Sequence, residues 1–415
     1  MHLKLISLLG LATMVAVAWA ISMDRKRFPW RTVWWGLGLQ FIFAVIIIKT
    51  EFGRLVFDWA QRAVNRLNLC AVEGAKMVFG PLADDKVVTA AFGPQNVFIF
   101  VVSVSATIIL VSALSSLLYH LGILQRVVQA MAWVMQRAMR TSGSESLAAA
   151  ANIFMGQTEA PLVIKPYLAR TTQSELLAIM IGGMASIAGG VALAYVALGV
   201  NAGHLLAASV MSAPASLMIA KIILPEKEQS ETADTTAAGK VEKIATNSID
   251  ALCRGASEGV ALAINVMAML IAFVAVVALV NFLLGWFQGL LTVGKPITLQ
   301  TIFGWLNAPF AWLIGVPWDD CEKVGAVLGE RIVLNEFMGY LALTKVSGDL
   351  DQRSFVLATY ALCGFANFSS IAIQIGGIGA LAPTRRSDLA ALGLRAMIGG
   401  LLACYLTATV VGILL

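Results

Sequence analysis

Long apolar blocks, separated by short polar segments, recur along the whole chain of 415 residues. Most blocks have about 20 residues, the length that an α-helix needs to cross the hydrocarbon core of a membrane. The unbroken blocks, which predict spanning helices, are Leu5–Ile21, Val33–Ile48, Val97–Leu118, Leu205–Leu224, Val260–Phe287 and Ala396–Leu415. The pattern predicts an all-α polytopic membrane protein.

Other segments are amphipathic, short or hydrophilic. Phe52–Leu67 has its polar residues on one helical face and predicts an interfacial helix. A second amphipathic stretch, 125–140, carries arginine without acidic residues, which is typical of the cytoplasmic side. Ile302–Val316 is too short to span and predicts an interfacial or half-buried helix. The hydrophilic segment Pro225–Asp250 predicts an aqueous loop.

Two apolar segments are interrupted by acidic clusters. Glu145–Leu168 contains Gly156-Gln157-Thr158-Glu159 followed by Pro161, and Glu322–Lys345 contains Asn335-Glu336. A continuous spanning helix does not tolerate such clusters, because the freed backbone groups need partners inside the membrane. Each segment therefore predicts two short helices that meet at a polar tip, which is a re-entrant hairpin.

Two further apolar segments predict broken spans. Leu176–Val200 is interrupted at Ser186–Gly190, and Phe355–Leu381 is interrupted at Phe365–Ser370 and at Gly376-Gly377. The order of hairpin, broken span and unbroken span thus occurs at 145–224 and again at 320–415. Interrupted segments in corresponding positions of two halves indicate an internal repeat and the binding site of a transporter.

The composition supports a membrane protein and excludes several other classes. Hydrophobic residues make up 59% of the chain and charged residues only 13%, about half the charged share of a soluble domain. The net charge of +5 forms no basic patch interleaved with aromatic residues, so we expect no nucleic-acid partner. Five scattered cysteines and three separated histidines predict no disulfide framework, zinc cluster or catalytic triad.

The first apolar block has a strong charge asymmetry. Arg25, Lys26, Arg27 and Arg31 follow it, whereas only Lys4 precedes it. This predicts a retained helix whose C-terminal end faces the cytoplasm, with the amino terminus outside. A cleaved signal peptide, ending near Ala18-Trp19-Ala20, is the alternative.

Glu159 and Glu336 are the first candidates for a functional site. Both lie in apolar segments, where a carboxylate is costly and functional use is the default interpretation; the alternative is an ion pair with Lys165 or Arg331. Gln157 and Thr158 stand beside Glu159, and Asn335 stands beside Glu336. A carboxylate among amides suits a neutral ligand with NH and OH donors, such as a polyhydroxylated or heterocyclic compound.

Other polar residues allow both a functional and a structural interpretation. Asn367 and Ser370 are three positions apart and would share a helical face, as ligand contacts or as polar contacts between helices. Phe365 is expected to serve packing. Asn152 and Ser186 offer uncharged oxygens for Na⁺ beside unwound backbone, but their spacing alone favours structural roles as a cap and as a partner for a freed carbonyl.

Three linked motifs resemble those of the concentrative nucleoside transporters of the bacterial, sodium-coupled type. They occur in order over most of the chain and are strongest from about 145 to 381. The motifs are Gly156-Gln157-Thr158-Glu159-Ala160-Pro161, Gly329-x-Arg331-x-x-x-Asn335-Glu336-Phe337 and Cys363-Gly364-Phe365-Ala366-Asn367-Phe368-Ser369-Ser370-Ile371. This chain has Arg331 where the family pattern has lysine, and Met338-Gly339 where it has Val-Ala.

The resemblance implies eight transmembrane helices, two re-entrant hairpins, an interfacial helix and an inverted repeat. It also implies a homotrimer in the bacterial inner membrane, in contact with lipid, with both termini outside. The expected scaffold consists of 1–92, with N-terminal helices and a periplasmic connection, 93–144, with a scaffold helix and an interfacial helix, and 258–319, with a scaffold helix and a second amphipathic element. The expected transport domain consists of a first half, 145–224, and a second half, 320–415. A hydrophilic linker is expected at 225–257.

The function implied by the resemblance is symport of nucleosides, such as uridine, cytidine and adenosine, with a sodium ion and no organic cofactor. Gln157, Thr158 and Glu159 would address the nucleobase with Phe365 lining that side, and Glu336, Asn367 and Ser370 would hold the ribose. Asn152 and Ser186, with the backbone carbonyls of Met155 and Ile187, would bind Na⁺. The movement would be elevator-like alternating access.

Three alternatives remain from the sequence. A proton-coupled nucleoside symporter would use Glu159 or Glu336 as the proton carrier. A passive channel would need polar residues along whole helices, whereas the polar residues here are confined to the middle of the segments. An intramembrane enzyme could use Glu159 and Glu336 as a catalytic pair, but the sequence contains no metal cluster, activated nucleophile or phosphate-binding loop.

Overall fold

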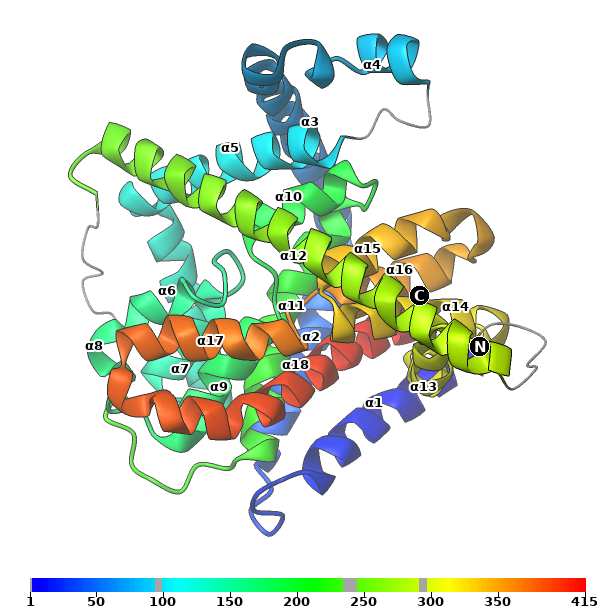
Figure 1. The fold of residues 1–415 in the computed structure, drawn as a ribbon. Coiled ribbons are helices and arrows are strands. Elements are labelled where there is room, and N and C mark those ends of the chain that lie inside the picture. The colour runs from blue at the N-terminus through cyan, green and yellow to red at the C-terminus, as the bar shows by residue number, and fades with distance from the viewer. Residues whose placement is uncertain (1, 94–98, 234–244, 291–296) are drawn as a thin grey trace.

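The computed structural model describes residues 2–93, 99–233, 245–290 and 297–415. Every regular element in these residues is a helix (Figure 1). The start of the predicted span Val97–Leu118 and the middle of the predicted loop Pro225–Asp250 lie outside the described residues. The all-α polytopic membrane fold predicted from the sequence is confirmed.

The N-terminal part contains six α-helices. Helices α1 and α2 correspond to the first two predicted spans, and α5 corresponds to the third. Helix α3 extends twelve residues beyond the predicted interfacial segment Phe52–Leu67. The bounds are α1 His2–Ala20, α2 Trp30–Lys49, α3 Glu51–Phe79, η1 Gly80–Ala83, α4 Asp85–Phe92, α5 Phe100–His120 and α6 Ile123–Met139. Helices α5 and α6 meet at an angle of 74°.

The first predicted hairpin is present. Helix α7 (Gly143–Ala151) runs into an irregular tip, and the chain returns through η3 (Ala160–Ile164) and α8 (Lys165–Leu168), with η3 packed against α7. The predicted break in the next span is also present, since α9 ends at Met184 and α10 begins at Gly189. The remaining bounds of this half are α9 Gln173–Met184, α10 Gly189–Ala197 and α11 Ala202–Ile223.

The second half repeats this order after a long helix. Helix α14 ends at Val333 and α15 begins at Glu336, so the second predicted hairpin turns at Leu334-Asn335. The following predicted span is broken between α16 and α17. The bounds are α12 Ser248–Leu290, α13 Leu299–Ile314, α14 Trp318–Val333, α15 Glu336–Lys345, η4 Ser347–Asp349, α16 Gln352–Leu362, α17 Phe368–Leu381, η5 Pro383–Arg385 and α18 Arg386–Leu414.

Two local predictions are wrong. Gly376-Gly377 does not interrupt α17, which continues to Leu381. Asn367 does not share a helical face with Ser370, because it lies before the first residue of α17 as its N-cap. The side chain of Asn367 ends the unwound segment as a cap, whereas two glycines only lower helix propensity and do not by themselves end a packed helix.

Membrane-spanning helices are identified by length and composition. Five of the described helical stretches qualify alone, and seven if the bent pairs α5–α6 and α13–α14 each count as one span. The stretches that qualify alone are His2–Ala20, Trp30–Lys49, Gln173–Ala197, Ala202–Ile223 and Pro383–Leu414. Helix α12, which contains the predicted span Val260–Phe287, has 43 residues.

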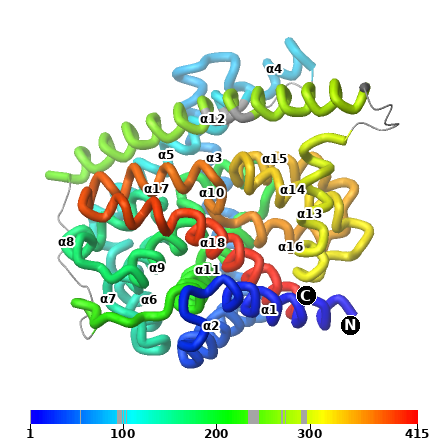
Figure 2. Tube along the Cα trace, turned by 60° about the horizontal axis from the view of Figure 1, so that its bottom comes forward, coloured from blue at the N-terminus to red at the C-terminus, as the bar shows by residue number. Residues whose placement is uncertain are grey.

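The helices form a core with α12 at its edge. Figure 2 shows α12 along one side of the molecule and α1 and α2 on the opposite side, with α9, α11 and α18 between them. These three central helices pack against one another and are largely buried. In contrast, α12 packs mainly on α5 and leaves apolar side chains such as Ile271 and Phe282 exposed.

Candidate functional site

The first hairpin holds its polar tip on a short, fully buried helix. Ser142 and Glu145 form a capping box at the start of α7, and the alanines that follow allow close packing. Gln157 is buried at the tip, whereas the side chain of Glu159 is exposed and accepts a hydrogen bond from the N–H of Gly156 at 3.1 Å. Glu159 therefore lies at an exposed edge of the tip.

The second hairpin places Glu336 at the N-terminus of α15. Asn335 caps this helix by accepting the N–H of Met338 at 3.0 Å. The Glu336 carboxylate is buried and accepts two hydrogen bonds, from the Tyr195 hydroxyl at 2.9 Å and from Asn367 Nδ2 at 3.2 Å. An acid in this position is stabilised by the helix N-terminus as well as by these donors.

The N-terminus of α17 connects the two hairpin tips. Asn367 Oδ1 accepts the backbone N–H of Ser370 at 2.9 Å, while its Nδ2 donates to Glu336. The Ser370 hydroxyl in turn accepts a hydrogen bond from Gln157 Nε2 at 3.1 Å. Gln157, Ser370, Asn367 and Glu336 thus form one hydrogen-bonded chain from the first hairpin to the second.

Thr158 and Phe365 lie beside this chain. A Cβ at Gly377 would lie only 2.6 Å from Thr158 Cγ2, so Gly377 lets the hairpin tip approach α17 closely. Phe365 is half-buried in the break between α16 and α17, and its N–H donates to the Ser186 carbonyl at 3.3 Å. The structure therefore brings Gln157, Thr158, Phe365, Asn367, Ser370 and Glu336 together around the ends of four helical segments.

The residues predicted to bind sodium lie at the end of α7 and in the break between α9 and α10. Asn152 is buried, and neither polar atom of its side chain has a hydrogen-bond partner among the described residues. A Cβ at Gly182 would lie 3.1 Å from Asn152 Nδ2. Ser186 Oγ donates to the Gly182 carbonyl at 2.9 Å, and Ile187 is buried beside it.

This donor set fits a hard monovalent cation. The Asn152 amide oxygen and the Ser186 hydroxyl are uncharged oxygens, and unwound backbone beside them leaves carbonyls free to coordinate. Asn152 is the C-cap residue of α7 and caps it through its backbone N–H, which donates to the carbonyls of Ala148 and Ala150, while its side chain makes no hydrogen bond among the described residues. Met155 is half-buried just after the helix and lies within the same tip.

Sequence comparison decides the family. Residues 9–82 match the "Na+ dependent nucleoside transporter N-terminus", residues 101–201 match "Nucleoside recognition" (Gate), and residues 204–412 match the "Na+ dependent nucleoside transporter C-terminus". The chain belongs to the sodium-dependent nucleoside transporter family. The resemblance seen in the three motifs is confirmed, and this is a family of transporters, not of enzymes.

Relatives of this nucleoside transporter extend over its whole length. YutK of Bacillus subtilis, a transporter, is 44% identical over 98% of both chains. Sodium/nucleoside cotransporter 1 of Rattus norvegicus is 39% identical over 99% of this chain and 64% of its own. CNTnw in an inward-facing, substrate-bound state is 38% identical, with a TM-score of 0.93 over 99% of this chain and 97% of that chain. A CNTnw double mutant in an outward-facing state is also 38% identical, with a TM-score of 0.94 over 99% of this chain and 98% of that chain.

Two residues of the site were missed by sequence reasoning. Tyr195 is an isolated tyrosine in an apolar helix, and nothing in the sequence distinguishes it from a packing residue. Gln374 did carry a signal, since it lies four residues after Ser370 and therefore on the same face of α17. It is fully buried, and its Nε2 donates to the Met180 carbonyl at 3.0 Å.

Gly183 allows Gln374 and Gln157 to approach each other. A Cβ at this position would lie 2.8 Å from Gln374 Nε2 and 2.9 Å from Gln157 Cβ. The Oε1 atoms of both glutamines are buried without a hydrogen-bond partner in the described residues. In this nucleoside transporter the first hairpin and α17 thus each place one buried amide acceptor against Gly183 of α9.

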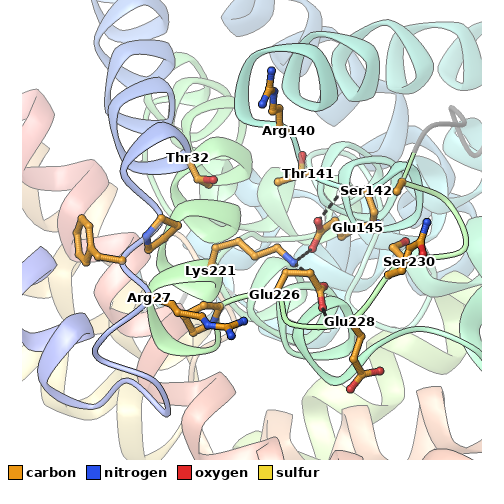
Figure 3. Close-up of a pocket in the computed structure, with 15 residues that line it drawn as sticks. Arg27, Thr32, Arg140, Thr141, Ser142, Glu145, Lys221, Glu226, Glu228 and Ser230 are labelled. Atoms are coloured by element: carbon orange, nitrogen blue, oxygen red, sulfur yellow. Dashed lines mark hydrogen bonds and ion pairs between the residues drawn. The ribbon is translucent and has the colours of Figure 1, made fainter.

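A separate pocket of about 460 Å³ lies at the base of the first hairpin (Figure 3). Lys221, near the end of α11, is buried there and forms ion pairs with Glu145 at 2.8 Å and with Glu226 at 3.3 Å. Its Nζ also donates to Ser174 Oγ at 2.9 Å. This cluster fixes the base of the hairpin to α9 and α11, and none of the predicted substrate residues lines it.

Proposed function

We propose that this protein is a secondary active symporter that imports nucleosides across the bacterial inner membrane, driven by a sodium gradient. The observation that carries the proposal is the hydrogen-bonded chain from Gln157 to Glu336, which joins the two hairpin tips. Its members are amides, a hydroxyl and a carboxylate, which are the partners that a neutral nucleoside needs for its NH and OH groups.

Each side chain has a proposed role. Gln157, Thr158 and Glu159 address the nucleobase with Phe365 lining that side, whereas Glu336, Asn367 and Ser370 hold the ribose hydroxyls. Four of these side chains now hydrogen-bond to one another, and a nucleoside would replace some of these contacts by its own donors and acceptors. A ligand that lacks one partner leaves a buried group unpaired, which costs about 1–3 kcal/mol. Uridine, cytidine and adenosine are the proposed substrates.

The proposed sodium site consists of Asn152, Ser186 and the backbone carbonyls of Met155 and Ile187. Its support is the buried Asn152 amide without a hydrogen-bond partner in the described part of the chain, next to unwound backbone. A cation there would stabilise the same hairpin that carries Gln157 and Glu159, so the ion and the nucleoside would order one element together. The alternative is proton coupling through Glu159 or Glu336.

The proposed movement is elevator-like. Residues 145–224 and 320–415 would form a transport domain that moves against a scaffold formed by 1–92, 93–144 and 258–319, with 225–257 as linker. Apolar side chains exposed on α3 and α12, such as Leu69 and Phe282, support contact with lipid and with other subunits of a homotrimer. Both termini would face outside.

The experiment is uptake of radiolabelled uridine into proteoliposomes under an inward Na⁺ gradient or, separately, an inward proton gradient. Accumulation above the equilibrium level with Na⁺ alone supports sodium-coupled symport. Accumulation with the proton gradient alone supports uridine as the substrate and contradicts sodium as the coupling ion. Liposomes that contain the Glu336→Gln variant serve as the control. If the original protein takes up no more uridine than this variant under either gradient, uridine symport is contradicted.

A further inference from the structure

Tyr195 lies where the two halves of the site meet. It is fully buried on α10, the second segment of the broken α9–α10 span, and its ring stacks on that of Tyr340 at a centroid distance of 4.4 Å. Its hydroxyl donates to Glu336 Oε1 at 2.9 Å. A residue of the first repeat therefore holds the carboxylate of the second.

This hydrogen bond fixes the direction of the Glu336 carboxylate. Oε1 accepts from Tyr195 and Oε2 accepts from Asn367, so each oxygen has one donor of known position. Arg331, the nearest buried cation in the sequence, forms no ion pair with Glu336 in the described residues and donates instead to the Ala361 carbonyl. Hydrogen bonds to a charged group are the strong ones, so losing one frees the carboxylate to turn.

The same helix begins at the proposed sodium site. The unwound residues Ala185–Ala188, which include Ser186, lead directly into α10 at Gly189. The Gly189 N–H donates to the Phe154 carbonyl of the first hairpin at 3.1 Å. Tyr195 is six residues further on, about 9 Å along a helix at 1.5 Å per residue. Because Gly189 and Tyr195 lie in one continuous helix, a displacement of its start would be carried to the Tyr195 hydroxyl.

We infer that Tyr195 is a positioning residue that orients the Glu336 carboxylate and transmits cation binding at the α9–α10 break to the ribose-binding end of the site. The inference rests on the proposed function and deepens it. Cation binding sets the tilt of α10, α10 sets the position of the Tyr195 hydroxyl, and that hydroxyl holds Glu336 ready for the ribose. Sodium thereby raises nucleoside affinity through one identified hydrogen bond.

The test is Tyr195→Phe, which removes one oxygen atom and keeps the ring stacked on Tyr340. The matched control is Tyr340→Phe, because the Tyr340 hydroxyl is equally buried but donates to the Thr359 carbonyl at 2.9 Å. Uridine affinity is measured at low and at saturating Na⁺ on purified protein, and the ratio of the two affinities is the sodium gain. The same measurements are made with 2′- and 3′-deoxyuridine.

For Tyr195→Phe we expect uridine affinity at saturating Na⁺ to fall about 10-fold, the sodium gain to shrink, and the deoxynucleosides to lose less than uridine. Tyr340→Phe keeps both the affinity and the gain within about two-fold of the original protein. An unchanged sodium gain in Tyr195→Phe overturns the inference, and so do equal losses in both variants, which would mean ring packing only. If the original protein itself shows no sodium gain for uridine, the proposed function fails, and the inference fails with it.

Discussion

The backbone N–H of Phe365 donates a hydrogen bond to the carbonyl of Ser186, 3.3 Å away, so the unwound segments of two broken helices meet. Each break frees backbone groups in an apolar environment, where an unpaired group costs several kcal/mol. Contact between the breaks satisfies part of this demand. Gly364 permits it, because a Cβ there would lie 2.7 Å from the Met184 carbonyl oxygen and 2.6 Å from Cys404 Sγ.

We therefore expect Gly364→Ala to separate the two breaks and to lower stability by about 1–3 kcal/mol, as overpacking does in other cores. The backbone carbonyl cannot rotate away as a flexible side chain could. The measurement is the thermal midpoint of the purified protein in detergent, together with uridine uptake. Gly376→Ala on α17 is the control, since nothing lies within 4 Å of a Cβ there. Equal midpoints for the two variants would contradict the prediction.

Glu336→Gln tests the ribose end of the site. Tyr195 and Asn367 both donate to Glu336, and a glutamine has only one acceptor oxygen, so one donor would face an NH₂ group. We expect uridine affinity to fall at least about 10-fold, while the elution volume in size-exclusion chromatography stays unchanged.

The control for this variant is Glu330→Gln, which removes another carboxylate from the same hairpin. Glu330 lies in α14, and no described contact links it to Asn367 or Tyr195. Its uridine affinity should stay within about two-fold of the original protein. Retained affinity in Glu336→Gln would exclude the ribose role.

Ser186→Ala tests the proposed sodium site. The substitution removes an oxygen that is proposed to bind the cation, while the hydrogen bond it loses goes only to the Gly182 carbonyl, four residues back in the last turn of α9. We expect the Na⁺ concentration for half-maximal uptake to rise roughly ten-fold, equivalent to about 1.4 kcal/mol. Ser212→Ala is the control, because Ser212 is equally buried and bonds back within its own helix, to Ser209 at 2.7 Å. The same Na⁺ response in both variants would leave Ser186 with a structural role.

Lys221→Met tests the cluster at the base of the first hairpin. It leaves Glu145, whose side chain is only 1% exposed, without its cation. Breaking a buried pair from one side typically costs about 3–5 kcal/mol, so the thermal midpoint should fall clearly. Glu226→Gln, at a side chain that is 30% exposed, should cost below about 1 kcal/mol because the Lys221–Glu145 pair remains. A larger effect of Glu226→Gln than of Lys221→Met would refute this assignment.

The sequence predicted those features that depend on periodicity and on rare residues. Both hairpins and both breaks follow from polar clusters in apolar segments, because such a cluster cannot remain in a continuous membrane helix. Glu336 and Gln157 were found in the same way. Helix α3 was predicted too short, because beyond Leu67 its buried face continues through small side chains, Ala71 and Ala75, which give only a weak apolar signal.

Contacts between distant segments could not be predicted. The hydrogen bond from Tyr195 to Glu336 joins residues 141 positions apart, and the one from Gln157 to Ser370 joins residues 213 positions apart. Residue type and spacing carry no information on which faces of two helices meet. The N-cap role of Asn367 was missed for a different reason, since the boundary of a helix within a broken span is set by the cap itself.

The adjacent glycines of α9 have a consequence for how this transporter can change. Gly182 opens space for Asn152, and Gly183 opens space for Gln157 and Gln374. Consecutive residues of an α-helix point about 100° apart, so one turn of backbone separates Asn152 of the proposed sodium site from Gln157 and Gln374. Inserting one residue in α9 would rotate the end of this helix by about 100° and move both glycines away from the side chains that they accommodate.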